Sequence, residues 1–229
     1  MFDVILDDNF SFRDEKIYVK NRPNIPVTIP SYKTSEVAKR NGSLTFRNNF
    51  PDREINIEFN FVDRVNVSAR IRKILNKILF CKKIKFTDDM EIYYKVKTVS
   101  MDSPERSYRH KCDFSVTFTL EPFAYLESDP IELDATNTIY NCGTYESEPN
   151  IRLYGAGDLQ LTINSKSFTV ANVNGYVDVN TSLFRCNKGA TNKLSDMTGD
   201  FPLLKVGENE IVLGANVLKV IITPNFRYL

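Results

Sequence analysis

The stretch that decides the fold is Thr117-Phe118-Thr119-Leu120-Glu121-Pro122-Phe123-Ala124-Tyr125-Leu126-Glu127-Ser128-Asp129-Pro130, near the midpoint of the 229 residues. Apolar and polar residues alternate from Phe114 to Leu120, which is the period of a half-buried β-strand. Pro122 ends this strand, because proline has no backbone N–H to donate to a sheet. Pro130 closes the segment, and the composition changes beyond it. The stretch therefore predicts a junction between two domains.

The predicted junction residues are Pro122, Phe123, Tyr125 and Pro130. Phe123 and Tyr125 are bulky enough to anchor the chain as it leaves the strand, and we expect them to pack between the domains. Residues 1–128 form the first predicted domain and residues 129–229 the second. A chain of 229 residues is long enough for two domains that each bury a core.

Composition limits the functional classes. Hydrophobic residues make up 42% of the chain and charged residues 26%, the balance of a globular protein. The formal net charge of +1 predicts no overall attraction to nucleic acid or to an anionic membrane. The four cysteines include no C-x-x-C pair, which favours reduced thiols over a zinc site or a disulfide framework. The acidic N-terminus and the lack of a long apolar run predict synthesis in a cytoplasm, without a signal peptide or membrane span.

The first half reads as β-strands around one helix. The expected strands cover residues 4–6, 17–19, 44–46, 55–61, 83–86 and 92–99, and residues 55–61 alternate without a break. From Val67 onward apolar residues follow the helical period, with Asn66 or Ser68 as the candidate N-cap. These elements predict a split β-barrel or curled sheet that carries one helix.

A proline-rich segment interrupts this half. Prolines occupy positions 23, 26 and 30, which excludes a helix and a central strand. The segment is either a solvated loop or an extended arm that reaches another subunit, and an Asn41-Gly42 turn follows it. The candidate inter-subunit arm residues are Arg22, Pro23, Ile25, Pro26, Val27, Ile29 and Pro30.

The second half is almost purely β. Short alternating runs are separated by expected turns at residues 155–158, 164–165, 172–175 and 207–209, a spacing typical of a β-sandwich or jelly roll. Gly155 and Gly157 do not form a dinucleotide-binding loop, because a third glycine and a following helix are missing. The aromatic residues offer a possible sugar-stacking platform, although strand aromatics more often pack in a core: Tyr140, Tyr145, Tyr154, Tyr176 and Phe184.

No catalytic, metal-binding or cofactor-binding set is evident. The one histidine, His110, has no nucleophile motif near it and is expected to face solvent. Asp88 and Asp89 are interpreted as turn formers, and the basic residues of the helix as a solvated face. Motifs of serine hydrolases, zinc proteases and phosphate loops are missing. We therefore predict that the chain is not an enzyme.

Several stretches together resemble the distal tail protein of long-tailed phages, a family also found in prophage tail regions. The first half contributes residues 22–29, 40–44, 55–80 and 82–94, and the junction contributes residues 118–125. The second half contributes Asn141 to Pro149, Gly155 to Leu159 and Met197 to Asn209. Each stretch is turn chemistry plus alternation, but their order and spacing cover nearly the whole chain.

This resemblance implies a homo-hexameric ring in the virion that joins the end of the tail tube to the tail tip or baseplate hub. It implies a barrel-like N-terminal domain whose arm embraces the neighbouring subunit, and a galectin-like C-terminal β-sandwich. The implied partners are the tail tube protein, a tail-tip, hub or tail-associated lysin protein, and a receptor-binding protein, with no membrane or specific nucleic-acid binding. The alternative is a carbohydrate-binding module that recognises a host-surface sugar through the C-terminal sandwich.

Overall fold

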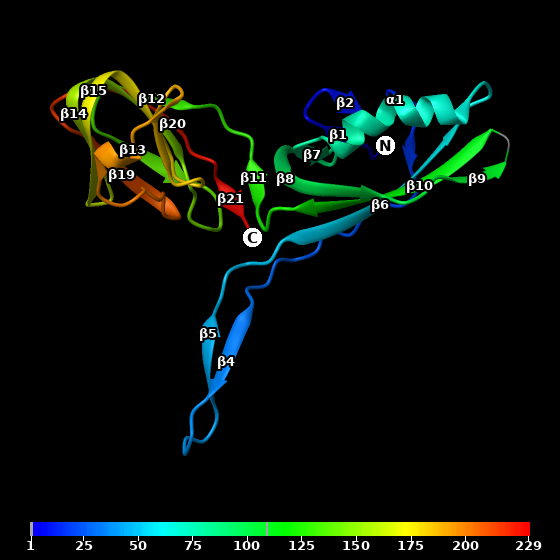
Figure 1. Ribbon diagram of the computed structural model, residues 1–229, viewed down its shortest axis with the longest axis horizontal. Helices are drawn as coiled ribbons and strands as arrows, with labels where there is room; N and C mark the ends of the chain where they lie inside the picture. The colour runs from blue at the N-terminus through cyan, green and yellow to red at the C-terminus, as the bar shows by residue number, and fades with distance from the viewer. Residues whose placement is uncertain (1, 109) are drawn as a thin grey trace. The chain divides into compact units, whose positions relative to one another are not determined.

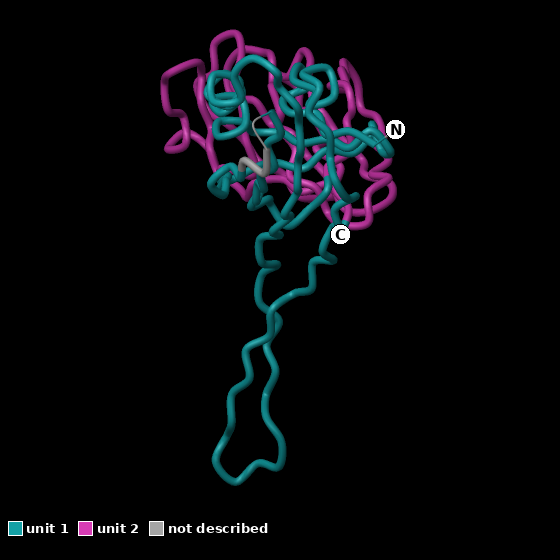
Figure 2. The backbone as a smooth tube through the Cα atoms, turned by 90° about the vertical axis from the view of Figure 1, so that its right-hand side faces the viewer, with its two compact units in different colours: residues 1–124, 229 teal, residues 125–228 magenta. Residues whose placement is uncertain are grey.

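Antiparallel β-sheet is the main regular structure in both halves of the chain, which confirms the predicted mainly β fold class (Figure 1). The structure is a computed structural model that describes residues 2–108 and 110–229. The chain divides into two compact units, coloured in Figure 2. Unit 1 is Met1–Ala124 with Leu229, and unit 2 is Tyr125–Tyr228. The boundary expected from the sequence lies four residues later, at 128/129.

Unit 1 contains one main sheet with the strand order β2-β1-β7-β8-β10-β6-β3. Its longest pairing is that of β6 with β10, which are in register over ten residues, and β9 also pairs with β10. The bounds are β1 Val4–Leu6, β2 Phe10–Ser11, β3 Tyr18–Val19, β6 Arg53–Val62, β7 Lys83–Phe86, β8 Asp89–Met101, β9 Glu105–Tyr108 and β10 Lys111–Leu120.

Alternation in the sequence builds the core of unit 1. On β6 the odd-numbered residues from Ile55 to Phe61 are buried and most even-numbered ones are exposed, so one face of the strand lies inside. The ring of Phe59 stacks between Phe12 at 4.2 Å and Phe114 at 5.3 Å, measured between ring centroids. These contacts join the first strands of the chain to its midpoint.

The predicted helix is confirmed as α1, Val67–Leu79. Asn66 caps it, because the Asn66 side-chain oxygen accepts a hydrogen bond from the Ala69 N–H at 3.0 Å. Val67, Ile74 and Ile78 are buried, as the helical period requires, and α1 lies next to β8.

A two-stranded hairpin projects from unit 1 (Figures 1 and 2). It consists of β4, Tyr32–Glu36, paired with β5, Ser43–Arg47. No other strand in the described residues pairs with either of them. The proline-rich segment leads into this hairpin without regular secondary structure.

Unit 2 is organised around one long hairpin, β14 with β15, whose strands take part in two layers. Along one part, β14 pairs with β20, and along the other it pairs with β19. The bounds are β11 Ala124–Leu126, β12 Ile131–Leu133, β13 Asn137–Asn141, β14 Asn150–Ile163, β15 Lys166–Asn180, β16 Arg185–Lys188, β17 Thr191–Asn192, η1 Leu194–Asp196, β18 Met197–Thr198, β19 Gly207–Leu213, β20 Val217–Thr223 and β21 Arg227–Tyr228. A contiguous apolar core fills the interior. The galectin-like form is compatible with this arrangement and stays a prediction.

Three of the expected turns in unit 2 are wrong. Residues 155–158 and 172–175 lie inside β14 and β15, which continue through them, and residues 207–209 begin β19. Gly155 faces Gly175 in the ladder, and the pairing shifts register at a bulge between Gly157 and Leu159. A Cβ at Gly155 would collide with the backbone oxygen of Asn216, so glycine permits a close approach between strands here. Only Asn164 and Ser165, both at positive φ, form the turn of this hairpin.

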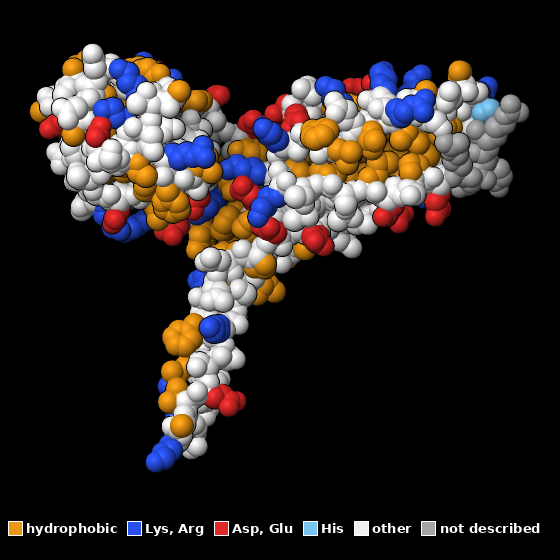
Figure 3. Space-filling view, viewed as in Figure 1, with side chains coloured by type: hydrophobic (Ala, Val, Ile, Leu, Met, Phe, Trp, Pro, Cys, Tyr) orange, Lys and Arg blue, Asp and Glu red, His pale blue; other side chains and the backbone are white. Residues whose placement is uncertain are grey.

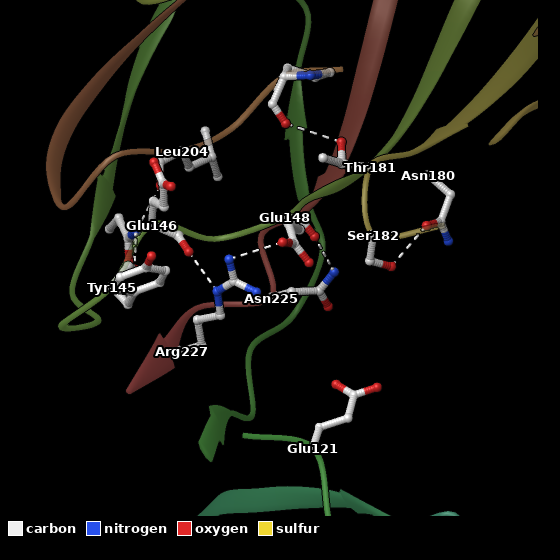
Figure 4. Close-up of polar contacts among 12 residues, drawn as sticks. Glu121, Tyr145, Glu146, Glu148, Asn180, Thr181, Ser182, Leu204, Asn225 and Arg227 are labelled. Carbon is white, nitrogen blue, oxygen red and sulfur yellow. Dashed lines mark hydrogen bonds and ion pairs between the residues drawn. The ribbon is translucent and has the colours of Figure 1, made fainter. Parts of the chain in front are cut away.

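Buried polar side chains hold the loops of unit 2 (Figure 4). The guanidinium of Arg227 donates to the Glu146 carbonyl at 2.5 Å and to the Glu148 carboxylate at 3.0 Å. Asn209, fully buried, accepts from Asn164 and from the backbone N–H of Lys205 and donates to three carbonyls. These groups are saturated with partners, as burial of polar atoms requires.

Candidate subunit interface

Several large apolar side chains of the arm, defined as residues 22–50, are exposed to solvent. The exposed fractions are 40% for Ile25, 80% for Val27, 66% for Ile29, 58% for Tyr32, 45% for Val37 and 54% for Phe46. Large apolar side chains gathered in solvent on one segment indicate an interaction site. The arm is therefore the candidate interface with another protein chain.

The arm is fastened at its root through the carbonyl of Pro122. The Thr28 hydroxyl donates to this oxygen at 2.8 Å, and Arg53 Nε donates to it at 2.6 Å. Both side chains are buried, and burial lowers the pKa of the Arg53 guanidinium, which lies over the Tyr94 ring at 5.8 Å. The Pro122 oxygen thus links Thr28, in the segment that leads out to the hairpin, to Arg53 at the start of β6.

Further contacts hold both ends of the arm to unit 1. Arg22 forms an ion pair with Asp88 at 3.2 Å and lies over the Phe2 ring at 5.0 Å. At the returning end the Phe50 ring meets Phe123 edge to face at 5.4 Å. The two ends are fixed and the apolar middle is left in solvent, which is the arrangement expected of a docking element.

The structure separates the predicted arm residues into anchors and exposed positions. Arg22 contacts its own unit, and Pro23 and Pro30 are half-buried. The exposed positions are Ile25, Pro26, Val27 and Ile29. Their assignment to an inter-subunit contact stays a prediction.

The junction residues lie in different surroundings. Pro122 follows the end of β10 and accepts the two hydrogen bonds described above, and Phe123 is buried against Phe50. Tyr125 is buried in β11, and Pro130 is exposed just before β12. The proposed packing of Phe123 and Tyr125 between domains is not tested by these contacts.

Sequence reasoning missed the hairpin and its root. Tyr32 and Phe46 were not recognised as arm residues, and Thr28 and Arg53 were not recognised as its fasteners. The Asn41-Gly42 signal did mark the loop between β4 and β5, where Gly42 has a φ of +80°. Reading alternation on both sides of that loop would have found the hairpin.

Of the possible sugar-stacking residues, only two come together. Tyr154 and Tyr176 are cross-strand neighbours with ring centroids 6.3 Å apart. Tyr140 lies on β13, Tyr145 lies beneath Arg227 at 5.4 Å, and Phe184 packs against Phe201 at 5.4 Å.

Cations cover this tyrosine pair. Arg152 lies over Tyr176 at 5.1 Å and binds Asp178 through two hydrogen bonds, which raise the pKa of Arg152. Lys219 lies over Tyr154 at 5.6 Å. A hollow of about 350 Å³ lies on the same face, lined in part by Arg152, Asp178, Asn150, Asn180 and Thr223.

Two kinds of feature are absent from the described part of the chain. Among residues 2–108 and 110–229, no three His, Cys, Asp or Glu side chains are grouped as metal ligands. Among the same residues, no helix has the length and apolarity to cross a membrane. His110 is exposed in the turn before β10.

Comparison with known proteins places this architecture among phage tail proteins. The family model described as phage tail protein RIFT-related domain matches residues 6–120, which is half of the chain and most of unit 1. No curated protein sequence matches the chain.

Solved structures share the fold over nearly the whole chain. The Dit protein (gp 19.1) of phage SPP1 matches at a TM-score of 0.72 and 14% identity, over 100% of both chains. A chain of the phage p2 baseplate activated with Sr matches at 0.54 and 11%, over 96% of this chain and 97% of that one. The form activated with Ca gives 0.55 and 11%, over 96% of each. These likenesses show the fold, and the family match over half of the chain shows that the chain belongs to the phage tail proteins that contain a RIFT-related domain.

Proposed function

We propose that this tail protein assembles into a homo-hexameric ring that connects the end of the tail tube to the tail tip or baseplate hub. The observation that carries the proposal is the arm: its ends are bonded to unit 1 and its apolar middle is exposed. The likeness to SPP1 Dit, described as a paradigm of the hub adsorption apparatus, and to a p2 baseplate chain supports a structural role at this position.

The physical case for a ring rests on the kind of contact that an arm makes. An arm that docks on a different surface of the next copy makes a head-to-tail contact, and such contacts close into rings when the rotation allows. Prolines at 23, 26 and 30 restrict the free arm, so docking costs less conformational entropy than for a flexible segment.

The proposed partners follow from this position in the virion. They are other copies of the chain, the tail tube protein, a tail-tip, hub or tail-associated lysin protein, and a receptor-binding protein attached to the assembly. The proposal includes no enzymatic step, since the tail proteins that the chain resembles are structural components.

The test is the state of association of the intact protein. Light scattering after size-exclusion chromatography should give the mass of six copies, and negative-stain images should show a ring with a central hole. Replacing Ile25, Val27 and Ile29 by serine should yield a folded monomer with unchanged circular dichroism. Wild-type protein that stays monomeric at every attainable concentration would contradict the ring.

A second candidate function is sugar recognition by unit 2, favoured by the adjacent rings of Tyr154 and Tyr176 on the face that carries the hollow. A sugar ring would have to displace Arg152 from Tyr176, which predicts weak binding. Glycan-array binding lost in Tyr176→Ala but kept in Tyr140→Ala, an exposed tyrosine on β13, would support it. No binding to host-wall saccharides would remove this candidate.

A further inference from the structure

The two faces of the β4–β5 hairpin differ in character. The register pairs Lys33 with Phe46 and Ser35 with Leu44, and directly opposed residues project to the same side. Val37 continues this side by the period of two. We call it the apolar face, defined by Lys33, Ser35, Val37, Leu44 and Phe46.

The opposite side of the ribbon is the polar face. Tyr32 opposes Arg47, Thr34 opposes Thr45, and Glu36 opposes Ser43. A two-stranded hairpin with no covered face is marginally stable in water. Only the apolar face offers Phe46, Leu44 and Val37 for burial, so it is the face that needs a partner surface.

Unit 1 itself carries a surface of matching chemistry. Val96, Val99 and Met101 of β8 oppose buried residues of β10, yet they are only half-buried. Ile71 and Leu75 of α1 are half-buried and Leu79 is exposed, although the helix packs next to β8. Figure 3 shows apolar side chains gathered over α1 and β8 in one band. We call this surface the α1–β8 band, defined by Ile71, Leu75, Leu79, Val96, Val99 and Met101.

Length fits the hairpin to this band. Five paired residues make the ribbon about 17 Å long, and α1, with thirteen residues, is about 20 Å long. Charges of both signs flank the band, with Lys95 and Lys97 beside Val96 and Asp102 after Met101, so length and apolar burial carry the fit.

We infer that the apolar face of the hairpin docks on the α1–β8 band of the next copy of this chain, with the polar face turned outward. This inference rests on the proposed ring and specifies its contact surfaces. One contact would cover both the apolar face of the hairpin and the α1–β8 band. Because the hairpin and the band are different surfaces, the contact is head-to-tail and repeats around a ring.

Disulfide cross-linking tests the face and the band together. In a Cys142→Ser background, which removes the exposed thiol, Ser35→Cys with Val99→Cys should form disulfide-linked ladders of copies under mild oxidation. The matched control is Thr34→Cys with Val99→Cys, since Thr34 is the exposed neighbour on the polar face. Its yield should be roughly tenfold lower, because its Cβ points away from the partner cysteine.

A pair of aromatic substitutions gives a second measurement that needs no cross-link. Phe46 and Tyr32 are similarly exposed, at 54% and 58%, but lie on opposite faces. Phe46→Glu should weaken ring association at least about tenfold, as expected for an apolar anchor, whereas Tyr32→Glu should change it by less than about threefold.

The outcomes separate the inference from the proposed function. Three cross-linking results would overturn the docking face or the band: links only in the Thr34 pair, equal links in both pairs, or no links in either pair. If rings persist in these experiments, the proposed ring still stands. Equal damage from Tyr32→Glu and Phe46→Glu also overturns the docking face. Wild-type protein without any oligomer overturns the ring and the inference together.

Discussion

The arm of unit 1 and the loops of unit 2 differ in which side chains they bury. In the arm, large apolar side chains such as Val27 and Phe46 lie in solvent, and the contacts described above with the rest of unit 1 lie at its ends. In unit 2, polar side chains such as Asn209 and Arg227 are buried and surrounded by partners. The partners of Asn209 and Arg227 thus lie within unit 2, whereas the arm needs a second molecule to cover its apolar residues. Substitutions in unit 2 should change the free energy of unfolding, and those in the arm should change association.

The largest effect is expected when the buried cation of unit 2 is removed. Arg227→Met leaves the Glu146 carbonyl and the half-buried Glu148 carboxylate without that partner, and should lower the free energy of unfolding by roughly 3 kcal/mol. Urea denaturation followed by fluorescence measures it. Arg152→Met is the control, since the Arg152–Asp178 pair is exposed and should contribute less than about 1 kcal/mol. Equal losses in both variants would remove the distinction between buried and exposed pairs.

A smaller loss is expected at the centre of the loop network. Asn209→Leu removes the hydrogen bonds from Asn209 to Ile139, Lys205 and Gly207 and leaves these carbonyls, that of buried Ile139 above all, short of partners, at a cost of about 2 kcal/mol. Thermal melting detects this cost. Asn192→Leu, at an exposed position, should change the melting temperature little. An unchanged melting temperature for Asn209→Leu would mean that these bonds add no net stability.

The root of the arm should respond by about 1 kcal/mol. Thr28→Val keeps the shape of the side chain but loses the bond to the Pro122 carbonyl, which still accepts from Arg53. The arm should then detach more often, and trypsin should cut faster at Lys33, Lys39, Arg40 and Arg47. Ser31→Ala, which removes a bond on the exposed part of the arm, is the comparison. Equal cutting rates in Thr28→Val and the wild type would show that Thr28 does not secure the arm.

The last prediction concerns accessibility and leaves stability unchanged. Burial raises the pKa of Cys81 to about 12 and that of Cys186 to about 11, so both stay protonated and shielded between pH 7 and 9. Cys142 is exposed. A maleimide reagent should therefore label one site per native chain, identified as Cys142 by mass spectrometry, and four after unfolding. Labelling of Cys81 or Cys186 in the native protein would show that these cores open.

Alternation and helical period were enough to predict the local elements. The unbroken pattern of residues 55–61 predicted β6, and the apolar spacing after Asn66 predicted α1 with its cap. Pro122 marked the end of β10 because proline has no backbone N–H to donate to a sheet. These features depend on residues that are close in the sequence, so they can be predicted from sequence patterns alone.

The missed features depend on residues far apart in the chain. Gly155 was interpreted as a turn residue, but it is glycine because the backbone of Asn216 passes close to it. Thr28 and Arg53 become fasteners only when the fold brings the Pro122 carbonyl between them. The apolar residues of the arm were recognised as a candidate interface, yet their distribution between two faces follows from the strand register.

The shared Pro122 carbonyl also has a mechanical consequence. A force on the segment that leads out to the hairpin is transmitted through the Thr28 hydrogen bond to this oxygen. Arg53 of β6 donates a hydrogen bond to the same oxygen. Pro122 lies three residues before Tyr125, at which unit 2 begins. In the proposed ring, tension from a docked neighbour would reach the backbone within three residues of this boundary.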